Sequence, residues 1–381
     1  MHLIGGPSEA VLTAAAEVPT PAVVYDLDHI SRTVRQLRDD VSGIPGTGIL
    51  FAVKANRFPP VLSHLAALAT GADVASRAEY EAAAAASMRP VTATSPGLTG
   101  SEMSELAANG VLVDLCSRSQ LQDYARCAGS RGTAIGLRVR VPVAPVERAG
   151  AGIAWSRLGV DPSDRELHRL LAEHELRVTR LHAHTGELMT ARRAEQLLAA
   201  LLHCTDLFPH VTTVNIGGGL ASLYADPRQA EDAWQRIGAL LREHAERSGR
   251  RLALVVEPGM LLTALAGYLV VTALAVEQHP SGTAVVTVDG SGWSLLSWTA
   301  PRLVGQLPAR DTARFPYSVG GSSCYEEDYL VRHTEATEIR PGDRLVLNAA
   351  GAYVTSMARA MHGSPAPFET AVSEKGRRHD R

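Results

Sequence analysis

One pattern recurs between Tyr25 and Pro258: a short run of β-branched residues, a polar or glycine stop, and an amphipathic segment rich in Ala, Leu, Arg and Glu. Short apolar strands that alternate with helices are typical of parallel sheets whose faces are covered by helices. The eight candidate strands are residues 49–53, 72–75, 91–94, 111–115, 135–140, 178–183, 211–216 and 252–256. Eight such units predict a (β/α)8 barrel of the TIM type, and an open doubly wound sheet is the structural alternative.

The pattern changes after Glu257, where helical periodicity fades and apolar runs alternate with Gly, Pro and Asp turns. Such alternation predicts β-strands. The clearest runs are residues 268–271, 284–288 and 344–347. The apolar stretch 261–276 is broken by Gly267 and is too short to cross a bilayer comfortably, so it also predicts a strand.

These patterns divide the chain into three parts. We predict a barrel over residues 27–262, a β-sandwich or β-barrel domain built from residues 1–26 and 263–372, and a disordered charged tail over residues 373–381. The run Val23-Val24-Tyr25 in the opening segment is expected to add a strand to the β domain.

Composition narrows the possible partners. A hydrophobic fraction of 45% over 381 residues allows a sizeable core, and a formal net charge of -3 gives no polyelectrolyte character. We therefore expect neither nucleic acid nor a membrane as a partner. The N-terminus lacks a basic region followed by a long apolar run, so no signal peptide is expected. The four cysteines form no C-x-x-C pair, which favours a reducing, cytoplasmic location.

The carboxyl ends of the predicted strands carry groups that can hydrogen-bond or ionise. TIM barrels place their active sites at these ends. The groups are Lys54, Ser76, Ser95, Asp114, Arg138, Arg140, His184, the glycine run 217–219 and Glu257. The sequence therefore predicts a ligand at one mouth of the barrel.

Lys54 and the glycine run suggest two parts of a cofactor site. Lys54 ends an apolar stretch, where an amine is costly to desolvate and can act as a Schiff-base nucleophile; a lysine that reaches solvent is the alternative. Gly217, Gly218 and Gly219 allow backbone N–H groups to converge on a phosphate, although a tight turn explains them equally. The run is not G-x-G-x-x-G, which disfavours a dinucleotide.

Two histidines and a glutamate add to that site. His182 and His184 lie on one face of a strand, as in a metal pair or a histidine stacked on an aromatic cofactor. No further ligand cluster lies near them in the sequence, so we predict no metal site. Glu257 could keep a pyridine nitrogen protonated, or serve as a turn carboxylate. Together with the lysine and the glycines, these groups supply the parts that pyridoxal phosphate needs.

Seven segments, in matching order and spacing, carry a resemblance to a known family. They are residues 51–56, 73–76 with Glu79, 182–186, 216–219, 257–259, 321–324 with Asp328, and 351–353 with 356–358. Over residues 20–372 the chain resembles the fold-type III pyridoxal-phosphate decarboxylases, the group of diaminopimelate, ornithine and arginine decarboxylases. The resemblance implies an alanine-racemase-like architecture, a barrel followed by a β domain, with pyridoxal 5'-phosphate as cofactor.

The resemblance also implies roles for individual residues. Lys54 would form an imine with the cofactor, His184 would stack on its ring, and Glu257 would contact its pyridine nitrogen. Cys324 would reach into a neighbouring subunit's site as a candidate proton donor, so a head-to-tail homodimer with shared active sites is implied. The expected cofactor-binding set is Lys54, Asp73, Arg138, His184, Gly217, Gly218, Gly219, Glu257, Gly259 and Tyr353, and the expected catalytic residues are Lys54 and Cys324.

Two residues depart from the family pattern near the phosphate. Glu187 stands where the family has a phosphate-binding serine, and Met260 replaces the arginine of Glu-Pro-Gly-Arg. A carboxylate beside a dianionic phosphate is repulsive by several kcal/mol at low dielectric. We therefore expect Glu187 to point away from the phosphate, toward a cationic substrate group.

The expected substrate pocket departs as well. Tyr325 follows Cys324 where diaminopimelate decarboxylases have a glutamate. Trp298 lies in a stretch that lacks the family's arginine, although Arg302 is near enough in the sequence to replace it. These changes favour a larger, more apolar or conjugated substrate. The candidate substrate contacts are Glu187, Met260, Trp298, Tyr325 and Glu326.

The leading interpretation is a pyridoxal-phosphate-dependent decarboxylase that removes the α-carboxylate of a specialised substrate, as in siderophore or antibiotic pathways. One alternative is diaminopimelate decarboxylase of lysine biosynthesis. Another is an amino-acid racemase or epimerase, against which Glu257 argues because racemases of this type favour an arginine at the ring nitrogen. The last is a non-catalytic pyridoxal-phosphate-binding homologue, for which Glu187 and Met260 would be signs of lost cofactor contacts.

Overall fold

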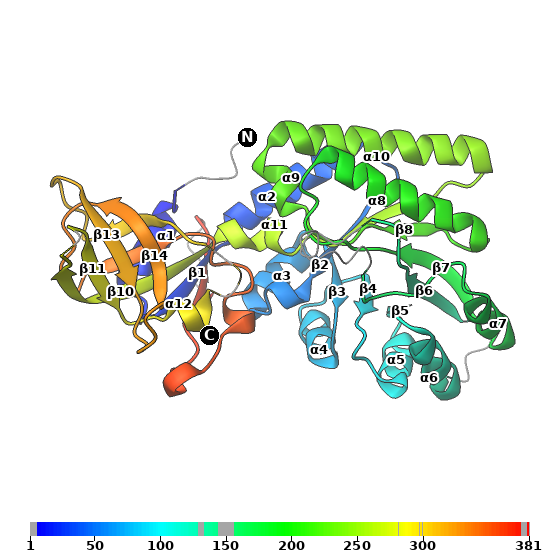
Figure 1. Ribbon diagram of the computed structural model, residues 1–381, viewed down its shortest axis with the longest axis horizontal. Helices are drawn as coiled ribbons and strands as arrows, with labels where there is room; N and C mark the ends of the chain where they lie inside the picture. The colour runs from blue at the N-terminus through cyan, green and yellow to red at the C-terminus, as the bar shows by residue number, and fades with distance from the viewer. Residues whose placement is uncertain are drawn as a thin grey trace. The chain divides into compact units, whose positions relative to one another are not determined.

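The structure is a computed structural model that describes residues 6–128, 133–143, 156–280, 282–296, 298, 300–374 and 379–380 (Figure 1). The chain forms two compact units. The barrel unit holds Val34–Lys54 and Leu65–Leu261, and the β unit holds the described residues up to Thr33, Ala55–His64 and the residues from Leu262 onward. Residues 27–33 and 55–64, which the sequence assigns to the barrel, thus group with the β unit, and the domain boundaries stay a prediction.

Eight parallel strands close the barrel unit into a ring. Each strand pairs with the next along the chain, and β9 pairs back onto β2. The strands are β2 (Gly48–Ala52), β3 (Gly71–Val74), β4 (Val91–Thr94), β5 (Leu112–Leu115), β6 (Ala134–Arg138), β7 (Arg177–His182), β8 (Thr213–Asn215) and β9 (Ala253–Val256). Each strand overlaps one predicted run. The predicted (β/α)8 barrel is confirmed, and the closing pair excludes the open doubly wound sheet.

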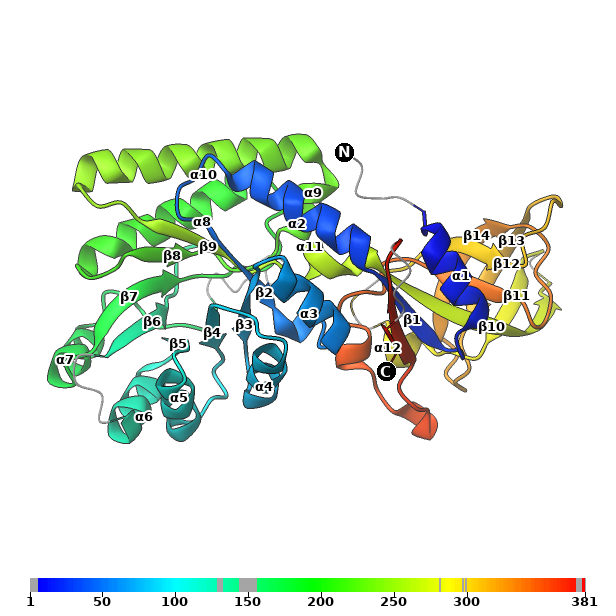
Figure 2. The same ribbon diagram turned by 180° about the vertical axis from the view of Figure 1, so that it is seen from behind.

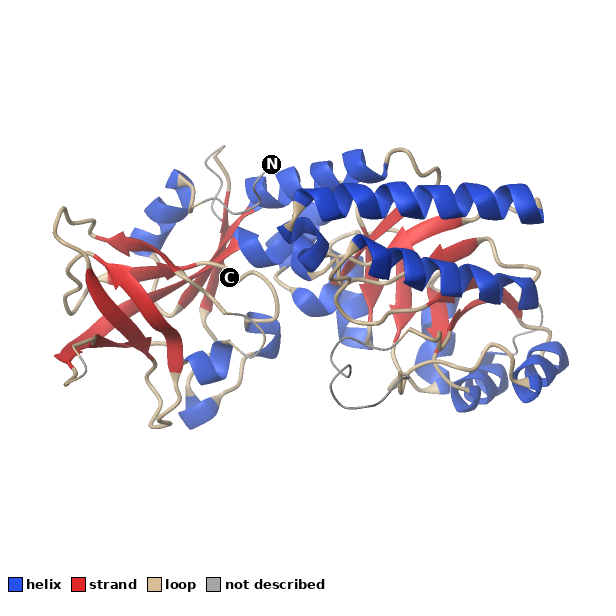
Figure 3. Cartoon of the chain, turned by 45° about the horizontal axis from the view of Figure 1, so that its top comes forward, coloured by secondary structure: helices blue, strands red, loops and turns tan. Residues whose placement is uncertain are grey.

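Helices lie outside this ring of strands (Figure 3). The helices that follow barrel strands are α3 (Pro59–Ala67), α4 (Arg77–Ala85), α5 (Gly100–Ala108), α6 (Arg118–Ala128), α7 (Arg165–Glu173), α8 (Ala191–Cys204), with the turn η3 (Thr205–Leu207), α9 (Ala221–Ala225) and α10 (Pro227–Ser248). Helix α2 (Leu27–Val41) precedes the first barrel strand, β2. Side-chain caps fix where several of them begin. The capping residues, which accept hydrogen bonds from first-turn N–H groups, are Ser76, Thr99, Asp164, Thr190 and Asp226.

A nine-stranded mixed sheet forms the β unit (Figure 2). Its order is β14-β13-β11-β10-β1-β16-β17, and β15 pairs with β10 and β12. The strands are β1 (Ala22–Asp26), β10 (Gly267–Gln278), β11 (Ala284–Val288), β12 (Leu303–Leu307), β13 (Phe315–Gly320), β14 (Tyr329–Ala336), β15 (Arg344–Leu347), β16 (Phe368–Val372) and β17 (His379–Asp380). Strand β1 pairs with β10 and with β16, so the strand expected at Val23-Val24-Tyr25 is present.

Short helices complete the β unit. They are α1 (Glu9–Glu17), α12 (Gly292–Leu295) and the 3-10 turns η4 (Ala264–Ala266), η5 (Thr355–Met357) and η6 (Met361–Gly363). Helix α11 (Met260–Thr263) begins with the last residues of the barrel unit and ends in the β unit. Helix α1 buries Val11 and Ala15 in one apolar cluster with Val24 of β1 and Val270 of β10. Burial of this face holds the helix on the sheet. No helix within the described ranges is long and apolar enough to cross a membrane.

Two parts of the β unit differ from the sequence predictions. The strand predicted over residues 261–276 begins only at Gly267, because the residues before it form the helical turns α11 and η4. The tail predicted to be disordered, residues 373–381, contains strand β17, which pairs with β16. Backbone hydrogen bonds thus order part of the tail, while residues 375–378 and 381 lie outside the described residues.

Candidate active site

Buried charged and polar side chains gather where the barrel strands end. Because all eight strands are parallel, their carboxyl ends meet at one rim, and residues far apart in the sequence come together there. The group consists of Asp73 on β3, Asp114 on β5, Arg138 on β6, Arg180 and His182 on β7, Asn215 on β8 and Glu257 after β9. The sequence prediction of a polar barrel mouth agrees with this arrangement.

Asp114 has the largest share of contacts in this group. Its carboxylate accepts hydrogen bonds from Arg180 Nε at 2.9 Å, His182 Nδ1 at 2.9 Å and Thr94 Oγ1 at 3.1 Å. The side chains of Arg180 and Asp114 are 2% and 0% exposed, so solvent screens this ion pair very little. Burial disfavours the charged carboxylate, but Arg180 and His182 outweigh that effect and lower the pKa of Asp114.

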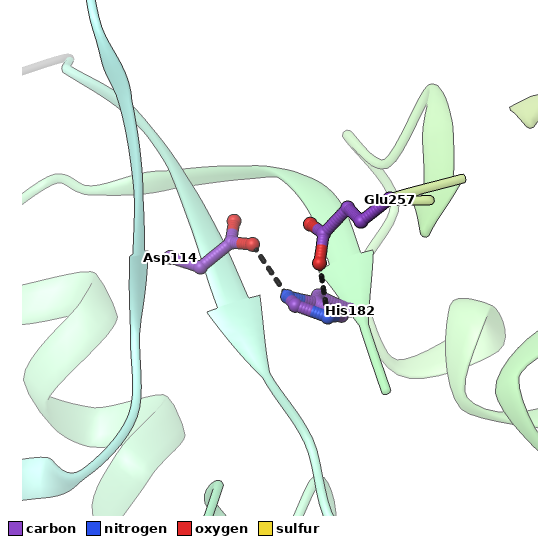
Figure 4. Close-up of side chains that lie close together, drawn as sticks. All are labelled: Asp114, His182 and Glu257. Atoms are coloured by element: carbon purple, nitrogen blue, oxygen red, sulfur yellow. Dashed lines mark hydrogen bonds and ion pairs between the residues drawn. The ribbon is translucent and has the colours of Figure 1, made fainter. Parts of the chain in front are cut away.

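His182 lies between two carboxylates (Figure 4). Asp114 can only accept, so it takes the hydrogen bond from His182 Nδ1, and burial lowers the pKa of His182. The ring is therefore neutral, and the lone pair of Nε2 accepts a hydrogen bond from Arg138 at 3.4 Å. Glu257 Oε2 lies 3.6 Å from the same nitrogen. A neutral His182 cannot donate to that oxygen, which is left able to meet another donor.

The same three residues are of types that bind metals. Among the described residues, ligand atoms of Asp114, His182 and Glu257 lie within 4.8 Å of one another. However, Arg138 contacts His182 and Arg180 contacts Asp114. A metal cation would meet two fixed positive charges, so we interpret the trio as a hydrogen-bond network. The predicted absence of a metal stays a prediction.

Asn215 joins Glu257 to the glycine run. Its Nδ2 donates to Glu257 Oε1 at 2.6 Å, and its Oδ1 accepts from the N–H of Gly217 at 2.8 Å. The N–H of Glu257 in turn donates to the carbonyl of Gly217 at 2.8 Å. One carboxylate oxygen of Glu257 is therefore fixed, and its backbone is tied to the loop that follows β8.

The glycine run leaves no room for side chains. A Cβ on Gly217 would lie 2.7 Å from the Cβ of His184, and one on Gly218 would lie 2.6 Å from the carbonyl oxygen of Glu257. Gly217 and Gly219 also have φ angles of 70° and 80°, in the region that favours glycine. A bare backbone thus packs against His184, which is the form of backbone that can surround a phosphate.

His184 presents a half-buried, neutral ring beside this backbone. Burial, with the charges of Arg138 and Lys54, lowers the pKa of His184 well below its usual value. Its Nδ1 is buried and has no hydrogen-bond partner in the described part of the chain. Buried polar atoms without hydrogen-bond partners are uncommon in proteins. A neutral ring that has such an atom is suited to contact with a bound molecule.

Lys54 follows β2, in the short 3-10 turn η1 (Val53–Ala55). Its side chain is exposed although the residues on either side are buried. The ammonium group acts to lower the pKa of both Asp73 and His184, so it lies near them. Burial and the charge of Glu257 nevertheless raise the pKa of Asp73 well above its usual value.

Glu187 does not face a substrate cation in these contacts. Its Oε2 accepts hydrogen bonds from the N–H of Ser222 at 3.2 Å and from Ser222 Oγ at 3.0 Å, at the start of α9. The next residue, Leu188, donates its N–H to the carbonyl of Gly219 at 2.7 Å. Two donors beside the glycine run hold the carboxylate, and its expected orientation toward a cationic substrate group stays a prediction.

The remaining predicted residues follow β9 or belong to the β unit. Gly259 follows β9, and Met260 begins α11. Trp298 packs its ring on Tyr353, with 4.9 Å between ring centroids, and the N–H of Tyr353 donates to the carbonyl of Ala55. Cys324, Tyr325 and Glu326 are exposed in the turn between β13 and β14. The roles expected for these residues stay predictions.

Sequence reasoning does not single out Arg180 or Asn215 as site residues. Both are buried, and both fix a carboxylate: Arg180 holds Asp114, and Asn215 holds Glu257. A usable pattern exists for Arg180, because Arg180, His182 and His184 alternate along one strand and its extension and so lie on one face. Asn215 has no such pattern, since it is the single polar residue before the glycine run.

The site fits a flat, phosphorylated cofactor. The neutral ring of His184 offers a stacking face. The glycine run offers bare backbone, beside which there is no room for a Cβ. Glu257 supplies a carboxylate oxygen suited to a protonated ring nitrogen. With an exposed lysine after β2, these features define the class of barrel enzymes that use pyridoxal phosphate.

The comparisons with known proteins give the family. The family model described as "Pyridoxal-dependent decarboxylase, pyridoxal binding domain" matches residues 27–264. The chain therefore belongs to the pyridoxal-dependent decarboxylase family. The predicted fold class, pyridoxal 5'-phosphate as cofactor, and the enzyme class, a carboxy-lyase, are confirmed.

Individual relatives are similar to this protein over nearly the whole chain. A diaminopimelate decarboxylase of Pseudomonas fluorescens is 30% identical, covering 90% of this chain and 85% of its own length. One from Zymomonas mobilis is 26% identical, covering 94% and 89%. A solved diaminopimelate decarboxylase from M. jannaschi has a TM-score of 0.84 at 20% identity, covering 97% and 92%. A lysine decarboxylase from Selenomonas ruminantium has a TM-score of 0.79 at 21% identity, covering 97% of each chain, and both structures support the fold.

Asp114→Asn is expected to destabilise the chain by about 3–5 kcal/mol at pH 7, because it leaves Arg180 buried without its carboxylate. The pKa of Asp114 is lowered on folding, so its contribution is present above the ordinary Asp value of about 3.9 and is lost as the pH falls through the lower folded value. The measurement is urea unfolding of both proteins at pH 7 and in acid.

Asp232→Asn is the matched control for this change. Asp232 pairs with Arg236 at 2.8 Å on the surface of α10, where solvent screens the charges. The decrease in the free energy of unfolding is expected to be much smaller for Asp232→Asn than for Asp114→Asn. Equal unfolding free energies for the parent and Asp114→Asn at pH 7 would contradict the structural role given to Asp114.

Gly217→Ala is expected to weaken pyridoxal phosphate binding, because the new Cβ would push against His184. Gly249→Ala is the matched control: Gly249 has a φ of 69°, close to the 70° of Gly217, but a Cβ there meets nothing within 4 Å. Both variants carry the left-handed backbone cost of about 1–2 kcal/mol. Titration of the cofactor-free proteins separates them, and equal affinities would show that contact with His184 is irrelevant to the cofactor.

Proposed function

We propose that this chain removes one α-carboxylate of diaminopimelate, releasing carbon dioxide and leaving lysine. The observation that carries the proposal is the similarity to diaminopimelate decarboxylases, at 30% and 29% identity over 90% of the chain for the two Pseudomonas proteins. The specialised siderophore or antibiotic substrate expected from the sequence is less well supported by these relatives. A racemase remains disfavoured by Glu257.

The barrel residues would divide the work of holding pyridoxal phosphate. Lys54 would bind it covalently, His184 would lie on its ring, and Gly217–Gly219 would hold the phosphate; the family resemblance adds Tyr353 of the β unit as a phosphate contact. Glu257 would keep a proton on the ring nitrogen through Oε2, since Asn215 already fixes Oε1. When bound, the cofactor supplies the electron sink that makes loss of an α-carboxylate possible.

Buried charges around Glu257 support this assignment. The neutral state of His182 prevents a hydrogen bond from Nε2 to Glu257, and Asp114 keeps that state fixed by accepting from Nδ1. Burial and the charge of Glu257 raise the pKa of Asp73 well above its usual value, so Asp73 holds its proton more readily than an ordinary aspartate. Glu257 Oε2 would then be the carboxylate oxygen that meets a protonated pyridine nitrogen.

The assembly belongs to the same proposal. In the family resemblance Cys324 serves a neighbouring subunit, so the active chain would be a head-to-tail homodimer with two shared sites. The exposed position of Cys324, 3.5 Å from His362, is compatible with such a role. A cytoplasmic location, favoured by the scattered cysteines, stays a prediction.

A specific observation also favours the second candidate, a larger and more conjugated substrate. Trp293 and Tyr325 are 45% and 44% exposed, their rings lie 4.9 Å apart, and the guanidinium of Arg359 lies 5.3 Å from the Trp293 ring centroid. Exposed aromatic faces with a cation beside them suit a flat group that bears negative charge. Diaminopimelate has no flat group beyond its carboxylates.

Carbon dioxide release from a panel of diaminopimelate, lysine, ornithine and arginine tests the proposal. Diaminopimelate is expected to give the highest kcat/KM, with lysine as product. Release from another amino acid but not from diaminopimelate would refute the substrate and retain the reaction class. No release from any of the four, in cofactor-loaded protein, would instead support the larger substrate.

Lysine content provides a sharp control for this assay. Lys54 and Lys375 are the two lysines of the chain. Borohydride reduction is therefore expected to fix the cofactor on the peptide that contains Lys54, and Lys54→Ala should abolish both this label and carbon dioxide release. Lys375→Ala should keep both. A label on Lys375 would contradict the assignment of Lys54.

Glu187→Ser is expected to tighten pyridoxal phosphate binding several-fold. The carboxylate of Glu187 lies at Ser222, close after the glycine run, where its charge would oppose a dianionic phosphate. Glu187→Gln removes the charge but keeps the size of the side chain, and it should give much of the same increase in cofactor affinity. Cofactor titration of the cofactor-free proteins measures the effect, and unchanged affinity in both variants would place the phosphate away from Glu187.

A further inference from the structure

Cys324 and His362 form a thiol–imidazole pair in the β unit. Cys324 Sγ lies 3.5 Å from His362 Nε2, within hydrogen-bonding distance for sulfur. Both side chains are exposed, and 38 positions separate them in the sequence. A thiol and an imidazole in contact can pass a proton between them, as in many enzymes that use cysteine.

The turn that carries Cys324 is held by a buried carboxylate. Asp328 accepts hydrogen bonds from the N–H of Ser323 and the N–H of Trp293, each at 3.0 Å. Although burial opposes the charged form, these hydrogen bonds lower the pKa of Asp328, so it is ionised at neutral pH. The N–H of Gly321 also donates to the carbonyl of Asp328 at 2.8 Å. Cys324 thus stands on a fixed turn.

His362 occupies an unusual backbone position. It lies in the 3-10 turn η6 with φ 58° and ψ 17°, the left-handed region that residues with a Cβ seldom adopt. Such positions cluster at functional sites, where a side chain must be aimed in one direction. Here the backbone directs an imidazole at the one cysteine that the family resemblance assigns to catalysis.

We propose that His362 is a proton-relay residue that acts through Cys324 during decarboxylation. The proposal rests on the proposed function. Loss of carbon dioxide leaves an electron pair on the α-carbon. The S–H bond of Cys324 breaks and its proton forms the new C–H bond. The proton on His362 Nε2 then moves to the thiolate, and a solvent hydronium ion returns a proton to the imidazole and is left as water. One proton is consumed for each carboxylate lost, so the step balances.

The other three cysteines provide internal controls. Burial raises the pKa of Cys116 to about 12 and that of Cys204 to about 11, so neither thiol reacts readily at neutral pH. Cys127 is exposed, as is Cys324. A full-length Cys127→Ser background therefore leaves Cys324 as the readily alkylated thiol. Cys127 in the parent reports any general change in thiol access.

The first measurement is the rate of iodoacetamide alkylation at Cys324 in this background at pH 7, with and without the change His362→Asn. We expect the asparagine variant to react about three-fold more slowly, because no imidazole nitrogen then lies within hydrogen-bonding distance of Cys324 Sγ to take up the thiol proton during alkylation. Alkylation of Cys127 in the parent should not change with His362→Asn. Equal rates at Cys324 would overturn the proposal, and this result needs no substrate.

The second measurement is turnover of diaminopimelate by the cofactor-loaded protein. His362→Ala is expected to lower kcat with little change in KM, and added imidazole should restore part of the rate. An unchanged kcat, or no rescue by imidazole, would overturn the relay. If the unmutated chain does not turn over diaminopimelate, the substrate proposal fails by itself, and the alkylation result still decides whether the pair exists.

Discussion

The buried ion pair of Asp114 and Arg180 is the interaction on which the rest of the barrel mouth depends. Two charges with almost no solvent exposure are tolerated only when their hydrogen-bonding groups are satisfied. Asp114 therefore takes donors from Arg180, His182 and Thr94 together. This fixes the tautomer of His182, so that Nε2 carries no proton to donate to Glu257 Oε2.

The glycine run imposes a second constraint on the barrel mouth, which arises from lack of space and not from charge. His184 and Glu257 approach the backbone of Gly217 and Gly218 more closely than any Cβ allows. Because Asn215 binds both Glu257 and Gly217, the charged network and the bare backbone form one connected structure. A change in either part would move the group proposed to hold the ring nitrogen and the group proposed to hold the phosphate.

Most of the barrel could be predicted from the sequence because each strand and the helix after it form a local pattern. The sheet of the β unit could not, since its pairings join distant segments: Ala22 pairs with Phe368, and Val23 with Leu269. The strand-end rule led to Lys54, His184 and Glu257. It did not lead to Arg180, because Arg180 lies within its strand and not at its end; the alternation of Arg180 with His182 and His184 is the pattern that could have found it. The contact between Cys324 and His362 could not be predicted either, because 38 positions separate the two residues in the sequence.

Whole-chain similarity and individual residues answer different questions about this protein. Replacing one residue of the network around Asp114 and the glycine run removes the hydrogen-bond partner of another buried group. The network can therefore change only through several simultaneous substitutions. The fold can therefore be shared at 20% identity. Trp293, Tyr325 and Arg359 are exposed and can be replaced singly at little structural cost. If substrate choice depends on such residues, as proposed, it can diverge while the proposed chemistry at Lys54 and Glu257 stays the same.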